Sequence, residues 1–385
     1  MRRDHALRAL LRAREGFTLG LLDATVQAVE GNGDTGMMRR VRFPPSPTGS
    51  LHVGNALTAV ANRAFGDWLL LRIDDTDSAR NVRGGENAIV RDLQWLGIEW
   101  DEGPVRQSER QDAYRKAAEQ LGGDRFGKIT LLRPDGTATY HLASVVDDIA
   151  FEITHVIRGS DHRPNEALHR ELTVALGARP PEYVHHGLIL GPDGHKLSKR
   201  DPLSSISDLR DAGIPPEAVR AYLDELGLPR HDVQLDVARI RRLAVEAIAA
   251  MPDEELAARI GVSLELVPAL RGARDLDEAR DFACQILEPE PVTLPSDARP
   301  TLERFRELAN SDARETVREL KAAGGDLRAL RLALTGRERG PELWTVLHAL
   351  TRDEALRRVD ASLTAHASPS RSPAPPGASE GRPEP

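Results

Sequence analysis

The order of secondary-structure patterns along the chain constrains its fold more than any other feature. From residue 38 to residue 200, short apolar strand patterns alternate with longer helical patterns, whereas residues 201–365 carry almost only helical patterns. Strands that alternate with helices pair in parallel, because a parallel pair needs a long crossover connection. We therefore predict an α/β domain with a parallel sheet over 38–200, followed by an all-α half.

The individual elements are predicted from the period of the apolar residues. Strands are expected where four to six residues are mostly apolar, and helices where apolar residues recur every three or four positions. The Pro-rich stretch 287–300 is expected to be a loop within the helical half. The predicted strands are 39–43, 68–73, 129–132, 153–157 and 186–190, and the predicted helices are 53–65, 86–96, 108–121 and 165–176.

The two ends of the chain differ in composition from the rest. Residues 1–37 are Arg-rich with leucines at helical spacing, and we interpret them as an N-terminal extension that is helical or poorly ordered. Residues 366–385 are rich in Pro, Ser and Gly and lack the large apolar side chains that a core needs. We expect these last residues to form a disordered tail.

Composition excludes several classes of protein. No apolar run approaches 18 residues, which excludes a transmembrane helix. The single cysteine, Cys284, excludes a disulfide scaffold and a zinc site built from several thiolates, so we expect a cytoplasmic protein without bound zinc. The formal net charge is −8, so a nucleic-acid partner would have to meet a local basic face.

The first chemical motif is VRFPPSPTGSLHVGN at 41–55. An apolar strand ends at Phe43, a Pro-rich turn follows, and a helix is expected to begin near Val53. His52 and Gly54 would then lie at a helix N-terminus, where free backbone N–H groups and the helix dipole favour phosphate. Gly54 would let a nucleotide approach the backbone closely. The motif indicates a nucleotide site, although HVGN alone is a short string of low specificity.

The second motif is GPDGHKLSKRD at 191–201, which contains Lys196 and Lys199. The chain has 47 arginines and only 5 lysines, so a surface loop that needed only positive charge would be expected to contain Arg. A compact ammonium differs from a planar guanidinium in how it follows charge on a phosphate. The two lysines therefore indicate groups that stabilise a transferring phosphate, rather than a solvated basic loop.

Together these motifs resemble class I aminoacyl-tRNA synthetases, and specifically the glutamyl-tRNA synthetase family. HVGN at 52–55 is similar to the HIGH signature of that class, and KLSKR at 196–200 is similar to its KMSKS loop. The resemblance covers about residues 38–365 and implies a Rossmann-like catalytic domain at 38–200, a helical stem-contact region at 201–250 and an anticodon-binding-like domain at 251–365. Further matching motifs are RFPPSPTG at 42–49, RIDDTD at 72–77, WLGIEWDEGP at 95–104, RPDGTATYHLASVVDD at 133–148, THVIRGSDH at 154–162 and LRLALTGRERGPEL at 330–343.

The resemblance also implies substrates and site residues. The expected substrates are glutamate, ATP with its Mg²⁺, and a tRNA, most simply tRNA-Glu, and we expect a monomer. The implied reaction joins glutamate to ATP as glutamyl-adenylate and then transfers the glutamyl group to tRNA. The implied catalytic residues are His52, Gly54, Lys196 and Lys199. ATP would also contact Ser46, Asn55, Leu197 and Ser198, and glutamate would contact Arg42, Ser46, Asp74, Tyr140, Ser144 and Arg158.

The sequence departs from the family pattern in three places. Asp74 stands where the family has Glu, and Ser144 stands where it usually has Asn, so glutamate selectivity is an open point. In the family, a domain that grips the tRNA acceptor stem is inserted after the helix that follows QSER. Here GGDRFGK at 122–128 leads directly to the strand pattern at 129–132, and seven residues form an ordinary connection, not a domain.

Two alternative functions therefore stay open. The chain could form glutamyl-adenylate and deliver it to another acceptor, such as a modified tRNA nucleotide, a carrier protein or an amine, as the glutamyl-queuosine synthetases do with a modified nucleotide. It could also be a non-catalytic relative that binds tRNA. The helical half favours a tRNA ligase, the short connection at 122–128 favours another acceptor, and the intact HVGN and KLSKR motifs argue against a purely binding role.

Overall fold

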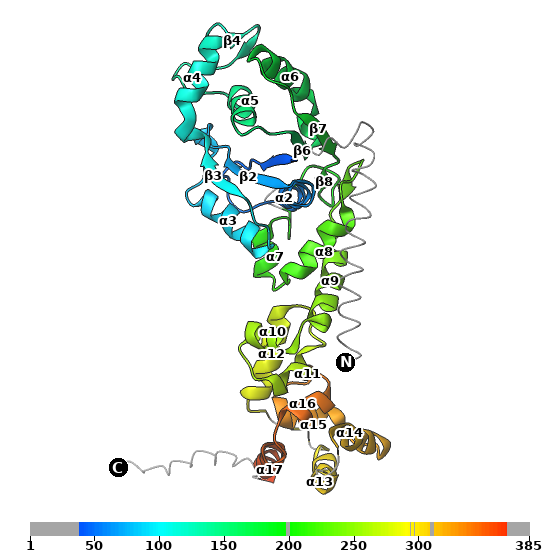
Figure 1. Ribbon diagram of the computed structural model, residues 1–385. Helices are drawn as coiled ribbons and strands as arrows, with labels where there is room; N and C mark the ends of the chain where they lie inside the picture. Colours follow the sequence, from blue (N-terminus) through cyan, green and yellow to red (C-terminus); the bar gives the residue numbers. More distant parts are fainter. Residues whose placement is uncertain (1–37, 198–200, 293, 296, 309–311, 368–385) are drawn as a thin grey trace, which may run out of the picture. The chain divides into compact units, whose positions relative to one another are not determined.

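The computed structural model describes residues 38–197, 201–292, 294–295, 297–308 and 312–367. Residues 1–37 and 368–385 lie outside the described residues, so the predictions for the two ends of the chain stay predictions there. Residues 366 and 367 are described and are the last two residues of a helix. The described chain divides into two compact units, one up to Ala247 and one from Ile248 (Figure 1). The first unit contains two clusters of buried apolar side chains and the second unit contains one.

A parallel sheet forms the centre of the first unit, as the sequence predicts. Three strands pair in the order β1-β2-β3, and a second parallel pair, β6-β7, follows beside β1 (Figure 1). Thr154, the residue before β6, donates its backbone N–H to Arg40 of β1 over 2.9 Å. The strands are β1 (Arg40–Phe43), β2 (Trp68–Ile73), β3 (Glu102–Arg106), β6 (His155–Gly159) and β7 (Glu182–His186).

Helices connect these strands and bury an apolar face. Helix α2 begins after His52 and buries Val53, Leu57 and Val60, which fits the apolar residues at three- and four-residue spacing. The predicted helices at 53–65, 86–96, 108–121 and 165–176 are confirmed within a few residues. The helices of this region are α2 (Val53–Phe65), α3 (Gly85–Trp95), α4 (Gln111–Gln120), α5 (Tyr140–Ala150) and α6 (Glu166–Ala175).

Two predictions about strands were wrong. The pattern at 129–132 forms only β5 (Ile129–Thr130), which pairs antiparallel with β4 (Arg125–Phe126), so residues 125–130 form a small hairpin in place of a plain loop followed by a longer strand. The pattern at 186–190 is split, because β7 ends at His186 and β8 (Ile189–Leu190) pairs with β9 (Val233–Gln234). Gly187 lies at the break, where a Cβ atom would come within 2.0 Å of a backbone oxygen.

Among the longer elements of the first unit, strand β3 and helix α5 had no prediction. Strand β3 has the sequence EGPVR, and Gly and Pro are rare in strands, so its pattern does not indicate one. Helix α5 buries Ser144, Asp147 and Asp148 together with its apolar residues. Buried polar side chains interrupt the apolar stripe by which a helix is recognised.

The rest of the chain is helical. In the first unit, α7 (Ile206–Asp211) and α8 (Pro216–Leu226) pack into the same core as α2, so this unit extends beyond the boundary predicted at residue 200. Helix α9 (Val237–Ala250) crosses the division, and the described part of 248–367 contains no strand. After α9, the helices of the second unit are α10 (Asp253–Ile260), α11 (Val267–Leu270), α12 (Leu276–Leu287), α13 (Arg299–Leu308), α14 (Ala313–Ala322), α15 (Leu327–Thr335), α16 (Leu343–Ala349) and α17 (Arg352–Ala367).

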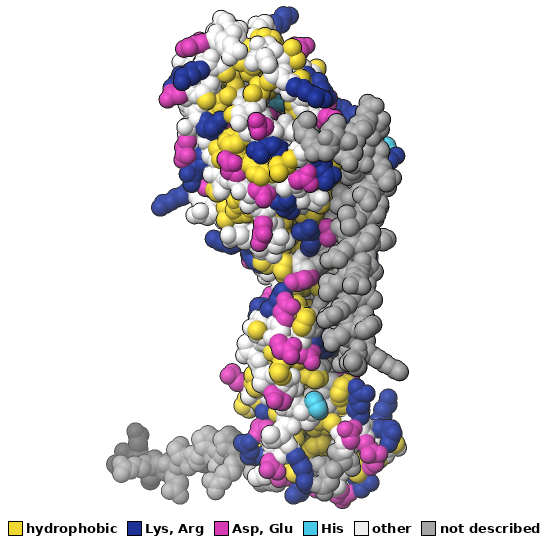
Figure 2. Space-filling view, in the orientation of Figure 1, with side chains coloured by type: hydrophobic (Ala, Val, Ile, Leu, Met, Phe, Trp, Pro, Cys, Tyr) yellow, Lys and Arg dark blue, Asp and Glu magenta, His cyan; other side chains and the backbone are white. Residues whose placement is uncertain are grey.

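None of the helices in the described residues is both long enough and apolar enough to span a bilayer. Figure 2 shows basic and acidic side chains interspersed on the visible face of both units.

Candidate active site

Two buried arginines lie at the same edge of the sheet. Arg42 is the third residue of β1 and Arg158 is the fourth residue of β6, and only 3% and 5% of these residues is exposed. Both residues lie near the C-terminal ends of neighbouring strands, and this carboxyl edge is where open α/β sheets bind their ligands. Arg42 donates from Nε to Asp148 over 3.3 Å, and Arg158 donates from Nε to His185 over 3.2 Å.

Three of the four outer nitrogens of these arginines lack hydrogen-bond partners among the described residues. Nη1 of Arg42 and both Nη1 and Nη2 of Arg158 are buried without an acceptor. An unsatisfied buried polar group costs about 1–3 kcal/mol, and more when it is charged. Buried arginines with free N–H groups are therefore suited to bind an anion such as a carboxylate, which can accept two parallel hydrogen bonds.

The third arginine of the site, Arg72 of β2, is completely buried and holds Asp74. Arg72 donates from Nε to Oδ1 of Asp74 over 2.7 Å and from Nη2 to Oδ2 over 3.2 Å. Its Nη1 donates to Asp148 over 3.0 Å, so Asp148 links Arg72 to Arg42. Burial raises the pKa of Asp74 although Arg72 opposes this shift.

Helix α5 contributes Tyr140 and Ser144. The hydroxyl of Tyr140 lies 3.5 Å from Nδ1 of His162. Burial raises the pKa of Tyr140, so the hydroxyl stays protonated and can donate a hydrogen bond. Ser144 is buried, and its Oγ accepts from Nη2 of Arg72 at 3.5 Å. Tyr140 thus belongs to the same cluster as Arg158, whereas Ser144 lies behind it against Arg72.

The HVGN motif lies at the start of α2, as predicted. His52 precedes the helix and forms a backbone bridge with Ser205, which precedes α7. A Cβ atom on Gly54 would meet only Ile189 within 4 Å, at 4.0 Å, so packing within the protein does not demand glycine there. Asn55 is exposed and Ser46 is half-buried in the turn after β1. This surface is open to a ligand that approaches the backbone.

The lysine motif is described only in part. The Nζ atom of Lys196 lies 2.5 Å from Oδ2 of Asp161 in the 3-10 helix Ser160–Asn165, although 70% of the lysine side chain is exposed. Leu197 is buried in the core of the first unit. Ser198 and Lys199 lie outside the described residues, so their predicted roles stay predictions.

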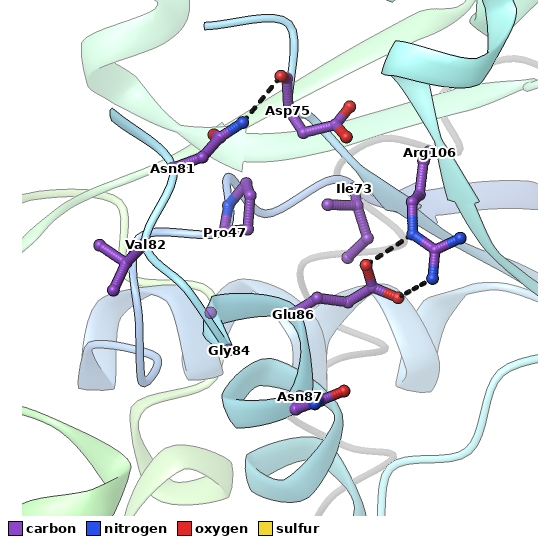
Figure 3. A pocket seen from close by; sticks show the side chains of 10 residues that line it. Pro47, Ile73, Asp75, Asn81, Val82, Gly84, Glu86, Asn87 and Arg106 are labelled. Carbon is purple, nitrogen blue, oxygen red and sulfur yellow. Dashed lines mark hydrogen bonds and ion pairs between the residues drawn. The ribbon is translucent and has the colours of Figure 1, made fainter. Parts of the chain in front are cut away.

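A cavity of about 300 Å³ is lined by residues from the ends of β2 and β3 and from the start of α3 (Figure 3). Ile73 and Arg106, the last residues of β2 and β3, line it together with Pro47 from the turn after β1, so it opens at the carboxyl edge of the sheet. None of the predicted site residues lines it, but Ser46 and Asp74 each precede a lining residue. The other lining residues are Asp75, Asn81, Val82, Gly84, Gly85, Glu86 and Asn87.

Sequence reasoning assigned no role to Arg72, Asp148 or His185. Arg72 could have been noticed, because an arginine in the apolar strand WLLLRI must find buried acceptors. Asp148 and its neighbour Asp147 end the VVDD motif, which matches the family sequence but indicates no role by itself. Asp147 is buried and accepts hydrogen bonds from Gln107, Arg110 and Tyr114. No sequence signal connects His185 with Arg158.

The sequence of this chain matches a known protein family. The model of the family described as "tRNA synthetases class I (E and Q), catalytic domain" matches residues 38–124 and 122–241. The two matched segments meet at 122–124, immediately before the β4-β5 hairpin.

Several curated proteins are similar to most of the chain. It is 34% identical to glutamate--tRNA ligase 1 of Rubrobacter xylanophilus, over 83% of this chain and 97% of that protein, and 32% identical to glutamate--tRNA ligase of Akkermansia muciniphila, over 83% and 98%. The first alignment has 418 positions, and 83% of 385 residues is about 320, so roughly 100 positions face gaps in this chain.

Among solved structures, a glutamate tRNA ligase from Elizabethkingia meningosepticum in complex with its amino acid has a similar fold. The TM-score is 0.66 at 23% identity, and the match covers 85% of this chain and 99% of that one. The architecture is therefore shared even where the sequences differ.

Proposed function

The chain belongs to the class I family of glutamyl- and glutaminyl-tRNA synthetases, and from this premise we propose how its residues carry out the reaction. It is a glutamate–tRNA ligase-like enzyme, an ATP-dependent ligase that joins an amino acid to tRNA. The family uses ATP to activate the amino acid as an adenylate. We place this reaction in the cytoplasm, where tRNA is charged.

Glutamate is the amino acid that the buried charges fit best. Arg42 and Arg158 together offer three buried guanidinium nitrogens without acceptors, which suit the carboxylates of this substrate. Glutamine would place a neutral amide against the same nitrogens and lose the charge-assisted hydrogen bonds. This set of unpaired nitrogens is the observation that carries the proposal, and Tyr140 would add a hydroxyl donor beside Arg158.

Asp74 would receive the ammonium group of the substrate. Both of its oxygens already accept from Arg72, which fixes the carboxylate in place, but each oxygen retains a second lone pair for the ammonium. The positive ammonium would also stabilise the charged form of a carboxylate whose pKa burial has raised. Ser144 would support this arrangement through Arg72 rather than by touching glutamate.

ATP would bind along the start of α2, where Ser46, His52, Gly54 and Asn55 lie. The α-carboxylate of glutamate attacks the α-phosphorus, the bond to the bridging oxygen breaks, and pyrophosphate leaves with the electron pair. His52, the helix N-terminus, Lys196 and Lys199 would stabilise the charge that builds up on the phosphate oxygens. Mg²⁺ would accompany the nucleotide.

The second step needs an acceptor, and we propose tRNA. The helical unit at 248–367 supports this proposal, because a protein that only made adenylate would not need it. Delivery to another acceptor is the second candidate function. It is favoured by the two family segments that meet at 122–124 and by the short β4-β5 hairpin, which together indicate that the acceptor-stem domain is lacking.

The decisive experiment is amino-acid-dependent ATP–pyrophosphate exchange, measured with and without tRNA and followed by a transfer assay. Glutamate-dependent exchange with transfer to tRNA supports the ligase. Exchange without transfer to tRNA supports the second candidate. A protein that binds tRNA but catalyses no exchange with any amino acid contradicts both and leaves the non-catalytic relative.

A further inference from the structure

A histidine lies directly behind Arg158. Strands β6 and β7 are parallel, and their register places the Cα atom of Arg158 opposite that of His185. Nε of the guanidinium donates to Nε2 of the imidazole over 3.2 Å. This bond uses the inner nitrogen of Arg158 and leaves Nη1 and Nη2, the two buried nitrogens without a partner among the described residues, for a ligand.

The same hydrogen bond determines the protonation of His185. Because Nε2 is the acceptor, the neutral ring must carry its proton on Nδ1. Nδ1 lies 3.5 Å from Oε2 of Glu166, the first residue of α6, and only 4% of the His185 side chain is exposed. The other oxygen of Glu166 accepts from Arg170 over 2.8 Å, which holds the carboxylate in place.

The surroundings keep this imidazole neutral. Burial lowers the pKa of His185 to about 4, and the guanidinium of Arg158 contributes to that shift, whereas Glu166 opposes it. Tyr183 stacks on the ring, with an interplanar angle of 9°, and its face also contacts the guanidinium groups of Arg158 and Arg170. A neutral, stacked ring is a fixed acceptor for Arg158.

We propose that His185, oriented by Glu166, is a positioning residue that fixes the guanidinium of Arg158 so that Nη1 and Nη2 face the substrate carboxylate together. Without an acceptor at Nε, the guanidinium could rotate and offer only one nitrogen at a time. A bidentate contact needs both nitrogens in the plane of the carboxylate, so the acceptor behind the arginine acts on amino-acid binding. This inference rests on the proposed function, since it assigns Arg158 to glutamate.

The first test is independent of activity. The full-length protein is labelled with ¹⁵N-histidine, and the His185 signals are identified by their loss in His185→Gln. At neutral pH we expect a protonated Nδ1 and an unprotonated Nε2, the reverse of the tautomer that predominates in free histidine. A protonated Nε2, in either the neutral or the charged ring, would overturn the proposal whether or not the enzyme activates glutamate.

The second test separates positioning from stability. His185→Leu removes the acceptor at similar volume, whereas His185→Gln restores an acceptor oxygen near the position of Nε2. His155→Leu is the matched control, because His155 lies on β6, the strand of Arg158, and its side chain faces Glu182 of β7 at 3.6 Å instead of Arg158.

We expect His185→Leu to raise the glutamate KM in the exchange reaction about tenfold or more, with the ATP KM unchanged and kcat affected less. His185→Gln should recover most of this loss, and His155→Leu should show none. An unchanged glutamate KM in His185→Leu, or equal losses for both substrates, overturns the positioning role. If the wild type catalyses no glutamate-dependent exchange, the proposed function fails, and the tautomer measurement still decides the contact between His185 and Arg158.

Discussion

Arg72 and Asp74 are separated by one residue in the sequence and joined by two hydrogen bonds, of 2.7 and 3.2 Å, at the end of β2. Asp74 is the first residue after the strand, and its carboxylate contacts the fully buried guanidinium of Arg72. This pair therefore couples the stability of the sheet to the part of the site that we assign to the ammonium group.

The first prediction concerns this pair. Asp74→Asn leaves a completely buried arginine with one fewer anionic partner, and we expect a loss of about 3 kcal/mol in the free energy of unfolding. Asp75→Asn is the matched control, because Asp75 is more exposed and bonds to Ser108; it should cost less than about 1 kcal/mol. Urea unfolding of the two variants checks this. Equal losses of unfolding free energy in the two variants would show that the pair of Arg72 and Asp74 does not stabilise the fold in this way.

A second prediction concerns acid sensitivity. Burial lowers the pKa of His169 from 6.5 to about 3, so between these values the unfolded chain binds a proton that the folded chain does not. The contribution of the neutral His169 to the free energy of unfolding is therefore fully present above about pH 6.5 and is lost as the pH falls below that value. At pH 5 the contribution of His169 to this loss is about 2 kcal/mol.

His169→Gln should reduce the difference in unfolding free energy between pH 7.5 and pH 5 by about that amount. The exposed His231, changed to Gln, is the control and should leave the difference as it is in the wild type. If the two variants have the same pH dependence, His169 is not kept neutral by the fold.

The third prediction concerns the lysine motif. Lys199→Ala should slow adenylate formation by roughly two to three orders of magnitude, the scale for one donor to a transition state. Lys199→Arg should also be impaired, because a guanidinium does not reproduce a compact ammonium. Lys321→Ala, in α14 of the second unit, is the control for loss of a lysine. Wild-type exchange rates in Lys199→Arg would contradict the argument from lysine scarcity.

The fourth prediction concerns the acceptor. The β4-β5 hairpin is too short to guide the end of a tRNA, and positioning contributes several kcal/mol to group transfer. We expect adenylate formation at an ordinary rate and slow transfer to tRNA, or transfer that needs a partner protein. Single-turnover kinetics with the purified adenylate complex measures both. Fast transfer to unmodified tRNA by the isolated chain would show that another surface guides the acceptor end.

Much of the catalytic fold could be predicted because its local patterns agree with its tertiary structure. Helix α2 and strand β2 have the predicted bounds, since their apolar residues are the ones that the core buries. Strand β3 and helix α5 could not be predicted in the same way. Their sequences contain Gly, Pro and buried Asp, and their stability depends on neighbours that are distant in sequence, such as Arg110 for Asp147.

For the site, the motifs indicated which residues matter but not how they are held. Four of the predicted residues lie at one edge of the sheet or contact residues there: Arg42, Asp74, Tyr140 and Arg158. Each of them has a partner that no sequence pattern indicates. Asp148 lies 106 residues from Arg42, and His185 lies 27 residues from Arg158. Such pairs depend on strand order and register, which one sequence does not specify.

The most direct test of the central claim is ATP–pyrophosphate exchange by the wild type and by Arg158→Ala, with glutamate and glutamine compared as substrates. We predict efficient exchange with glutamate and little with glutamine in the wild type. Arg158→Ala should raise the glutamate KM about a hundredfold, while the ATP KM stays the same. An unchanged glutamate KM in Arg158→Ala, or a wild type that prefers glutamine, would contradict the assignment of this site to glutamate.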